Sequence, residues 1–256
     1  MTSANADTKL RSRTKKGPAT EVGIDIIAAD HAVSAGEPSA RVDERCRTIL
    51  VNGPKGGLGK TTLVRNIAVA AALSGLRVAL ADLDPQKTLT KWWSRRPEGL
   101  AEISLWAAEM TDSEELLTLI GGHNFDVLLV DTPPGIEKYP EDIQRLIDSS
   151  DLLLVPCGPS SDESESVIPW MEFVVRFGKP AAFVMTRVDR RSSTAREVRL
   201  ELNRIGRLCP IDIPASEDIK RASKLGIGVQ EIAKGFGAVE VEGVWSFVRQ
   251  ELGLRR

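Results

Sequence analysis

Short apolar runs alternate with longer segments of helical spacing from residue 47 to the end of the chain. The apolar runs are mostly continuous, which is typical of strands that are buried on both faces. Strands are predicted at 47–52, 76–82, 126–131, 151–156 and 181–186, with weaker candidates at 102–107 and 209–213. Helices are predicted at 60–74, 86–95, 112–121, 140–149, 162–177, 192–207, 215–225 and 239–252. This alternation predicts an α/β fold, a doubly wound and mostly parallel sheet with helices on both faces.

The first 45 residues lack any sustained period and are rich in small and polar residues. Their first twenty positions hold five basic residues against one acid, Asp7. We expect a basic, mostly disordered tail, which either has no task or helps to hold DNA or a partner. Residues 46–256 contain no internal repeat and no linker, so we expect one domain there.

Composition and charge exclude few functions. The 256 residues are 42% hydrophobic and 27% charged, with a formal net charge of −2. These values are ordinary for a soluble globular protein, so any basic surface must be local. No run of 18 apolar residues and no secretory leader are present, which predicts a cytoplasmic protein. The three distant cysteines are expected to be free thiols, with a shared metal or iron–sulfur site as the alternative.

A glycine-rich turn between the first strand and the first helix carries the clearest chemistry. It spans residues 55–62: Lys55, Gly56, Gly57, Leu58, Gly59, Lys60, Thr61 and Thr62. Glycines let backbone N–H groups point at phosphates, and the helix N-terminus adds partial positive charge. Lys60 is predicted to reach the β- and γ-phosphates, and the Thr61 hydroxyl to bind Mg²⁺. ATP and Mg²⁺ are therefore the expected ligands.

Two acidic motifs follow strands that should end beside this loop. Asp82-Leu83-Asp84-Pro85-Gln86 follows the strand at 76–82, and Asp131 ends the apolar strand at 126–131 before Thr-Pro-Pro-Gly. Parallel strands place their carboxyl ends at one edge of the sheet, where such folds bind ligands. Asp131 is predicted to hold Mg²⁺, through a water, and a carboxylate is needed to hold the attacking water in line.

These motifs together resemble the ParA/MinD family of ATPases. The strict P-loop pattern needs glycine at position 54, where this chain has Pro54; it has instead an extra lysine, Lys55, within K-G-G-x-G-K-T-T. The D-x-D-P-Q and D-T-P-P-G motifs also match, and the resemblance covers 47–252, most closely to small plasmid-partition ATPases. It implies that Lys55 crosses a dimer interface to the partner's ATP, and that Asp84 orients the attacking water. More loosely, it suggests Arg187 and Pro214 as contacts of the base.

The resemblance also implies a function: ATP joins two subunits, the homodimer coats nucleoid DNA without sequence preference, and a centromere-binding partner protein stimulates slow hydrolysis. Residues 186–224 hold ten basic and six acidic residues and no aromatic one, which favours phosphate contacts without base stacking. The alternative to DNA binding is that these charges only form ion pairs on a solvated surface. The DNA-contacting candidates are Arg190, Arg191, Arg196, Arg199, Lys220, Arg221 and Lys224.

Other functions stay open at this point. The chain resembles MinD, a membrane-associated spatial regulator, but its terminal segment at 239–252 is expected to be a packed core helix without stable membrane binding. A positioning ATPase for a cargo other than DNA is a further alternative. An electron-transfer ATPase of the nitrogenase type would need paired cysteines, and a module that binds ATP without hydrolysis would not need the full set of Lys55, Lys60, Thr61, Asp84 and Asp131.

Overall fold

The computed structural model describes residues 45–135 and 138–254. Their centre is one six-stranded sheet in which every pairing is parallel, with the order β3-β2-β4-β1-β5-β6. The strands are β1 Arg47–Val51, β2 Val78–Asp82, β3 Ile103–Ala107, β4 Val127–Asp131, β5 Leu152–Cys157 and β6 Ala181–Met185. The predicted doubly wound α/β class is confirmed, and the strand at 102–107 is real. The predicted tail at residues 1–45 lies outside the described residues, except for Arg45.

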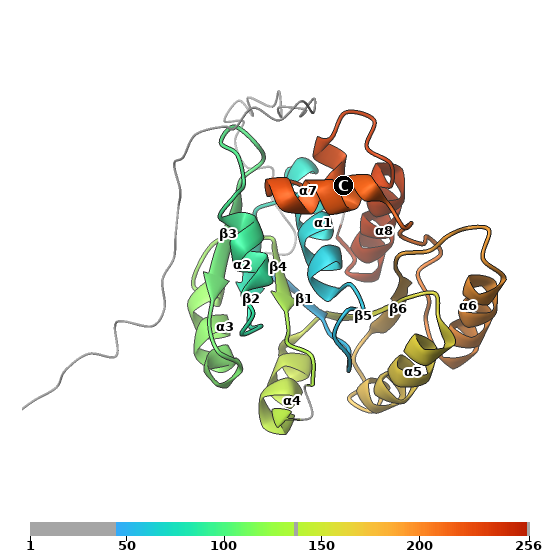
Figure 1. Ribbon diagram of the computed structural model, residues 1–256. Helices are drawn as coiled ribbons and strands as arrows, with labels where there is room; N and C mark the ends of the chain where they lie inside the picture. The colour runs from blue at the N-terminus through green and yellow to red at the C-terminus, as the bar shows by residue number, and fades with distance from the viewer. Residues whose placement is uncertain (1–44, 136–137, 255–256) are drawn as a thin grey trace, which may run out of the picture.

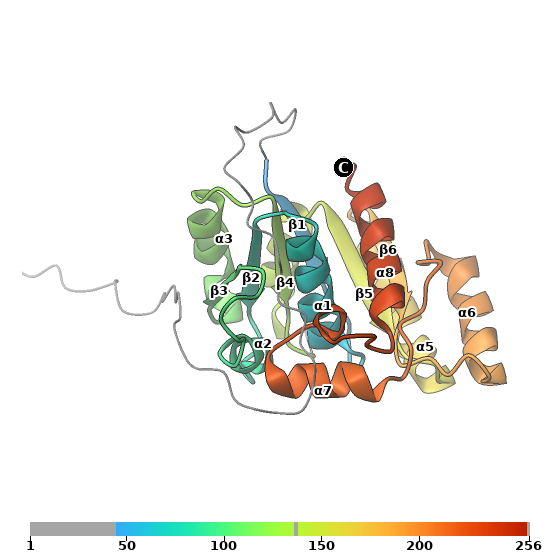
Figure 2. The ribbon, with the colours of Figure 1, turned by 90° about the horizontal axis from the view of Figure 1, so that it is seen from above.

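Helices cover both faces of the sheet (Figures 1 and 2). One face packs against helices that include α1 and α8, and the other against helices that include α3, α4 and α5. The helices are α1 Lys60–Leu73, α2 Thr88–Trp93, α3 Ser113–Gly121, α4 Pro140–Ser149, α5 Ser161–Val175, α6 Ser193–Ile205, α7 Glu217–Leu225 and α8 Ala238–Glu251. The last of these buries Val241, Val244 and Val248 against the core, as the sequence predicts for a packed helix.

The weaker strand predicted at 209–213 is wrong. This segment lies beside β6, but only two isolated bridges flank it, between Phe183 and Leu208 and between Val188 and Pro214. The backbone N–H of Cys209 still donates to the carbonyl of Phe183 at 2.9 Å. The next bond to β6 comes only at Ile213, whose N–H donates to the carbonyl of Met185 at 2.9 Å. Four residues of this segment thus span two of β6, so no regular ladder forms.

The register of the sheet brings the predicted motifs together. Val51, the last residue of β1, lies opposite Asp131 of β4, and Asp131 lies opposite Asp82 of β2. Three neighbouring strands therefore end at the same level, beside the turn that enters α1. In an open α/β sheet this carboxyl edge is where ligands bind.

Candidate functional site

The glycine-rich turn is shaped by backbone conformations that glycine adopts without strain. Gly57 has φ 79° and Gly59, the N-cap of α1, has φ 94°. A Cβ at Gly59 would also lie 3.2 Å from the hydroxyl of Thr186, which itself donates to the carbonyl of Leu58 at 3.0 Å. The left-handed turns and this close approach both require glycine at 59. The turn leads directly into the amino end of α1, where backbone N–H groups are unpaired by the helix.

The Lys60 side chain folds back over this turn. Its ammonium donates to the carbonyls of Lys55 at 2.9 Å and Gly53 at 3.4 Å. The residue is only 6% exposed, and burial lowers the pKa of the ammonium, while Asp131 and Asp84 raise it. No carboxylate within 4.0 Å pairs with Lys60 among the described residues. A buried cation held only by carbonyls is suited to receive an anion.

Asp131 is fully buried at the end of β4, directly beside this lysine's helix. Neither of its carboxylate oxygens accepts a hydrogen bond of ordinary geometry from a described residue. Burial raises the pKa of this carboxyl to about 7, and the neighbouring hydroxyl of Thr61 opposes that shift. An orphaned buried carboxylate next to a threonine hydroxyl is a donor set that suits a hard cation such as Mg²⁺.

The two aspartates after β2 have different surroundings. Asp82 is buried and accepts from the hydroxyl of Thr90 at 2.6 Å and from the Thr90 N–H at 2.8 Å. It thus fixes the start of α2, and burial raises the pKa of its carboxyl. Asp84 is half-buried, and one of its oxygens accepts from the N–H of Gln86 at 2.9 Å. Its charge acts on both Lys60 and Asp131, which places it at the same edge.

The D-T-P-P-G turn after β4 is fastened to the glycine-rich turn. The Thr132 hydroxyl donates to the carbonyl of Val51 at 3.0 Å, and the Gly135 N–H donates to the carbonyl of Pro54 at 3.2 Å. Lys55 lies between this turn and α5 and is exposed, with its ammonium 3.2 Å from the carbonyl of Asp162. Lys55 therefore reaches outward while Lys60 reaches inward.

The two predicted base contacts lie near each other, one strand away from the loop. Arg187 follows β6 with φ 57° and forms an ion pair with Glu163 of α5. Pro214 is buried and bridges to Val188, the residue after Arg187. Arg187 directly follows Thr186, which contacts the glycine-rich turn, and Pro214 pairs with Val188 two residues beyond Thr186.

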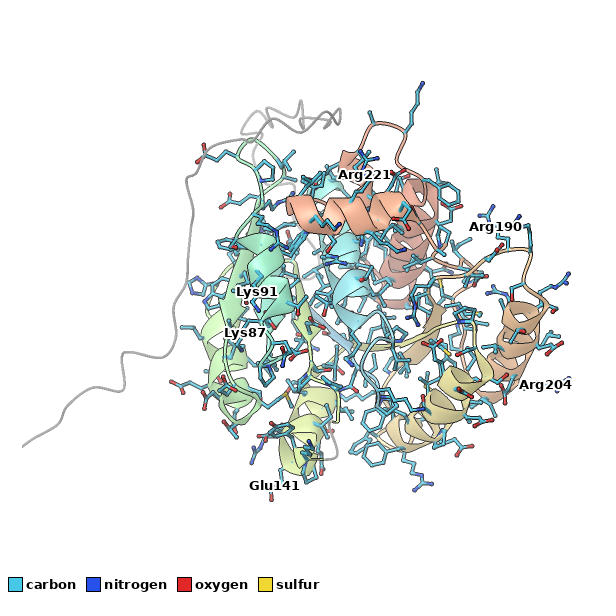
Figure 3. All side chains as sticks on the ribbon, in the orientation of Figure 1. Lys87, Lys91, Glu141, Arg190, Arg204 and Arg221 are labelled. Carbon is cyan, nitrogen blue, oxygen red and sulfur yellow. The ribbon has the colours of Figure 1, made fainter. Side chains whose placement is uncertain are left out.

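The seven predicted DNA contacts come from two helices and one turn, and Figure 3 labels two of them, Arg190 and Arg221. Arg196 and Arg199 belong to α6, Lys220, Arg221 and Lys224 belong to α7, and Arg190 and Arg191 lie in the turn before α6. Figures 1 and 2 show α6 and α7 in separate places on the molecule. Five of the seven form ion pairs: Arg190 with Glu240, Arg191 with Asp189, Arg199 with Asp212, Lys220 with Glu217 and Arg221 with Asp218. Arg199 is turned toward the chain, where it also donates to the carbonyl of Pro210 at 2.8 Å.

Sequence reasoning missed two buried polar residues at this edge. Asn52 follows β1, is fully buried, and has both amide atoms unpaired among the described residues. Arg65 lies one turn into α1, is 7% exposed, and donates to Thr62 at 2.8 Å and to Ser223 of α7 at 2.5 Å. The available signal was that Arg65 and its neighbour Asn66 interrupt the otherwise apolar run 63–73.

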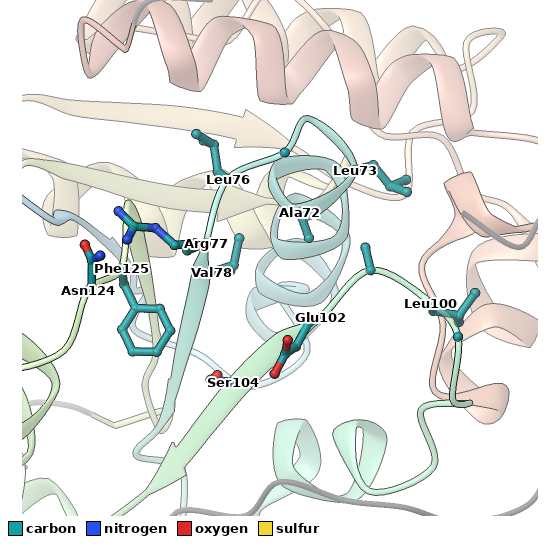
Figure 4. Close-up of a pocket in the computed structure, with 13 residues that line it drawn as sticks. Ala72, Leu73, Leu76, Arg77, Val78, Leu100, Glu102, Ser104, Asn124 and Phe125 are labelled. Carbon is teal, nitrogen blue, oxygen red and sulfur yellow. The ribbon is translucent and has the colours of Figure 1, made fainter. Parts of the chain in front are cut away.

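A surface pocket lies at the other end of the sheet (Figure 4). It is lined by the end of α1, the amino ends of β2 and β3, and the turn before β4, with Leu73, Leu76, Leu100 and Phe125 as its larger apolar side chains. The guanidinium of Arg77 at its wall is already held by Asp126. None of the residues predicted to act on a ligand lines it.

The described residues offer no metal cluster of histidine, cysteine and acidic side chains. Cys46, Cys157 and Cys209 are free thiols, as predicted, and burial raises the pKa of each. The iron–sulfur alternative therefore finds no ligand set in the part of the chain that is described. Within the same residues, no helix is both long and apolar enough to cross a membrane.

Comparison with known proteins places this site in a family. The family model for the CobQ/CobB/MinD/ParA nucleotide binding domain matches residues 49–229. The chain is 31% identical over 215 residues to the maintenance of carboxysome distribution protein A of Gloeobacter kilaueensis, covering 80% of this chain and 94% of that protein. It is 30% identical over 117 residues to the protein ParA of Rhizobium radiobacter, covering 44% and 49% respectively.

Solved structures show the same fold. The ATP complex of a Cyanothece McdA variant superposes with a TM-score of 0.66 at 20% identity, covering 84% of this chain and 99% of that one. The septum site-determining protein MinD of Pyrococcus horikoshii OT3, complexed with Mg-ADP, gives a TM-score of 0.64 at 18% identity, covering 82% and 98%. With the K-G-G-x-G-K-T-T turn between β1 and α1, these matches show that the chain belongs to the CobQ/CobB/MinD/ParA family, among its ParA/MinD ATPases with the deviant P-loop.

Proposed function

We propose that this chain is a positioning ATPase that distributes a cargo. Two subunits would form a dimer when ATP binds, and the dimer would come apart when ATP is hydrolysed. The observation that carries the proposal is the pair of lysines on one glycine-rich turn. Lys60 is buried and points inward, whereas Lys55 is exposed and, among the described residues, donates only to one carbonyl of α5. An exposed lysine at the mouth of a phosphate site is free to reach the nucleotide of a second subunit.

The roles of the remaining residues follow from their positions. The N–H groups of residues 56–62 and the Lys60 ammonium would hold the phosphates, because the turn leads into the amino end of α1 and the Lys60 side chain folds back over it. Thr61 and Asp131 would hold Mg²⁺, which neutralises charge on the phosphate oxygens when it is bound. Asp84, half-buried at the same edge, would orient the attacking water. Arg187 and Pro214 remain our candidates for the base.

The relatives favour a cargo other than a plasmid. The carboxysome distribution protein matches 80% of this chain, whereas the partition protein ParA matches 44%. We therefore propose a protein assembly as the cargo, the alternative that the sequence left open, ahead of DNA segregation. A partner protein on that cargo would stimulate hydrolysis. The MinC–MinD complex of Aquifex aeolicus is an example of a protein of this fold that binds a partner protein.

Non-specific DNA is proposed as the surface on which the dimer moves. Fewer side chains support this proposal than the sequence suggested, because Arg199 is held by Asp212 and by backbone carbonyls. Arg196 and Lys224 are exposed and have no ion pair among the described residues, and Lys220 and Arg221 are exposed and pair with acids of their own helix, so these four are our candidates for phosphates. Such binding would weaken steeply as the salt concentration rises.

The test is the molecular mass in solution with and without Mg-ATP. We expect the Asp84→Ala chain to become a dimer with ATP, and the Lys55→Ala/Asp84→Ala chain to stay a monomer while it still binds ATP. Lys234→Ala in the same background is the matched control, since Lys234 is another exposed lysine and lies outside the glycine-rich turn. A dimer that forms equally well without Lys55 would remove the basis of the proposal.

A further inference from the structure

The Arg65 side chain joins the start of α1 to α7 by hydrogen bonds. Its two terminal nitrogens donate in different directions, one to the Thr62 hydroxyl at 2.8 Å and one to the Ser223 hydroxyl at 2.5 Å. Thr62 belongs to the glycine-rich turn and Ser223 to the last turn of α7. Figures 1 and 2 both show α7 lying outside α1. The contact therefore joins two helices through residues, Arg65 and Ser223, that are 158 positions apart in the sequence.

Arg65 is also a buried cation without a carboxylate. It is 7% exposed, its Nε atom is unpaired, and no acidic side chain lies within 4.0 Å of its guanidinium among the described residues. Burial lowers the pKa of this guanidinium to about 10, while Asp131 is close enough to raise it. Burying an unpaired charge costs free energy, which a nearby anion would recover. The phosphates expected above Thr61 and Thr62 are such an anion.

The direction of the hydrogen bond between Arg65 and Thr62 favours phosphate binding. Because the Thr62 hydroxyl accepts from Arg65, its own proton is free to be donated to a phosphate oxygen. A hydroxyl that accepts from a cation is also a stronger donor. Arg65 thus prepares Thr62 for the nucleotide, while its other arm holds α7.

We propose that Arg65 is a positioning residue that couples the nucleotide site to α7, so that ATP binding at Thr62 tightens the hold on Ser223. This inference rests on the nucleotide site of the proposed function. Its consequence is that the exposed cations of α7 (Lys220, Arg221 and Lys224) are held more firmly when ATP is bound. Since coupling between two sites is reciprocal, loosening α7 must weaken ATP binding by the same factor.

Hydrogen exchange of the α7 amides, measured with and without Mg-ATP, tests the coupling. In the unchanged chain we expect ATP to slow exchange in Glu217–Leu225 by about five- to tenfold, a usual size for such coupling. Ser223→Ala should abolish this response and raise the Kd for ATP by the same factor. Arg65→Met should abolish the response and raise the Kd about tenfold or more, because it also removes a charged hydrogen bond to Thr62. Arg65→Lys should keep only part of the ATP response of α7, because its single ammonium replaces the two terminal nitrogens that donate to Thr62 and Ser223.

Arg95→Met is the matched control. Arg95, which follows α2, also donates to the carbonyl of Ser223, at 3.2 Å, and within the described residues it forms no hydrogen bond to the glycine-rich turn. A purely structural contact of this kind should speed α7 exchange equally with and without ATP and leave the ratio unchanged. If Ser223→Ala keeps the full ATP response, the inference about Arg65 is overturned while the proposed function stands. If the unchanged chain binds no ATP, both are overturned together.

Discussion

The two ends of the central sheet treat buried charge in opposite ways. At the amino end, Asp126 accepts from the Arg77 N–H at 2.8 Å and from its guanidinium at 2.8 Å and 3.1 Å. Asp151 accepts from the Thr48 N–H at 2.9 Å and also pairs with Arg47. Each carboxylate there is matched by a cation and a backbone donor, which stabilises the start of the strands.

At the carboxyl end the charges are buried but unmatched. Asp131 is more deeply buried than either of those aspartates, yet it accepts no ordinary hydrogen bond from the described residues. Lys60 and Arg65 are buried cations without carboxylate partners in the same set. Such an arrangement lowers the stability of the free protein, and it is understandable where a ligand supplies the missing charges. The difference teaches that one end of the sheet holds the fold together and the other is prepared for an anion and a metal.

The largest effect should come from the buried lysine of the carboxyl end. Lys60→Ala should weaken ATP binding by about a hundredfold or more, because it removes a charged donor from a water-poor site. Lys179→Ala is the matched control, since Lys179 also donates to two carbonyls, those of Asp148 and Ser150, but at the amino end. Titration with a fluorescent ATP analogue measures both. An equal loss of ATP affinity in the two variants would contradict the proposed difference between the two ends of the sheet.

The second effect concerns hydrolysis at the same end. Asp84→Ala should leave ATP binding intact and lower the rate of phosphate release by about a hundredfold, as expected for a carboxylate that orients water. Asp148→Ala, which changes an exposed aspartate at the amino end, should have no effect. Phosphate release at saturating ATP is the measurement. A wild-type rate in Asp84→Ala would show that this role is assigned wrongly.

The third effect is on stability, and its sign should differ between the two ends. Without nucleotide and Mg²⁺, Asp131→Asn should raise the free energy of unfolding by about 1–3 kcal/mol at about pH 8, because it removes a buried, unmatched carboxylate. Asp126→Asn should lower it by about 1–2 kcal/mol, because it breaks the pairing with Arg77. Urea unfolding of the three chains gives the comparison.

The stability contribution of Asp131 should also depend on pH. Burial raises the pKa of Asp131 to about 7 in the folded chain, from an ordinary value of 3.8, so the folded state binds a proton that the unfolded state has released. The contribution of Asp131 to stability should therefore fall as the pH rises from about 4 to about 7, so the total fall should be smaller in Asp131→Asn. A pH profile that is the same with and without Asp131 would mean that its carboxylate is matched in solution.

The sequence predicted most of the fold because its signals are local. Continuous apolar runs such as 126–131 and 151–156 report burial on both faces, and they gave the strands, the helices between them and the parallel class. It failed at 209–213, where the segment lies beside β6 but bonds to it only at Cys209 and Ile213, with too many residues between them for a regular ladder.

For the site, the sequence by itself determined which residues carry the chemistry of the glycine-rich turn, since K-G-G-x-G-K-T-T fixes backbone conformation and charge over eight neighbouring residues. Only the tertiary structure decided which charges are matched. Arg199 reads as a free surface cation but is held by Asp212, and Arg65 reads as a helix charge but reaches Ser223 on a distant helix. Spacing along a chain encodes local geometry, whereas the neutralisation of a charge depends on partners that only folding brings within hydrogen-bonding distance.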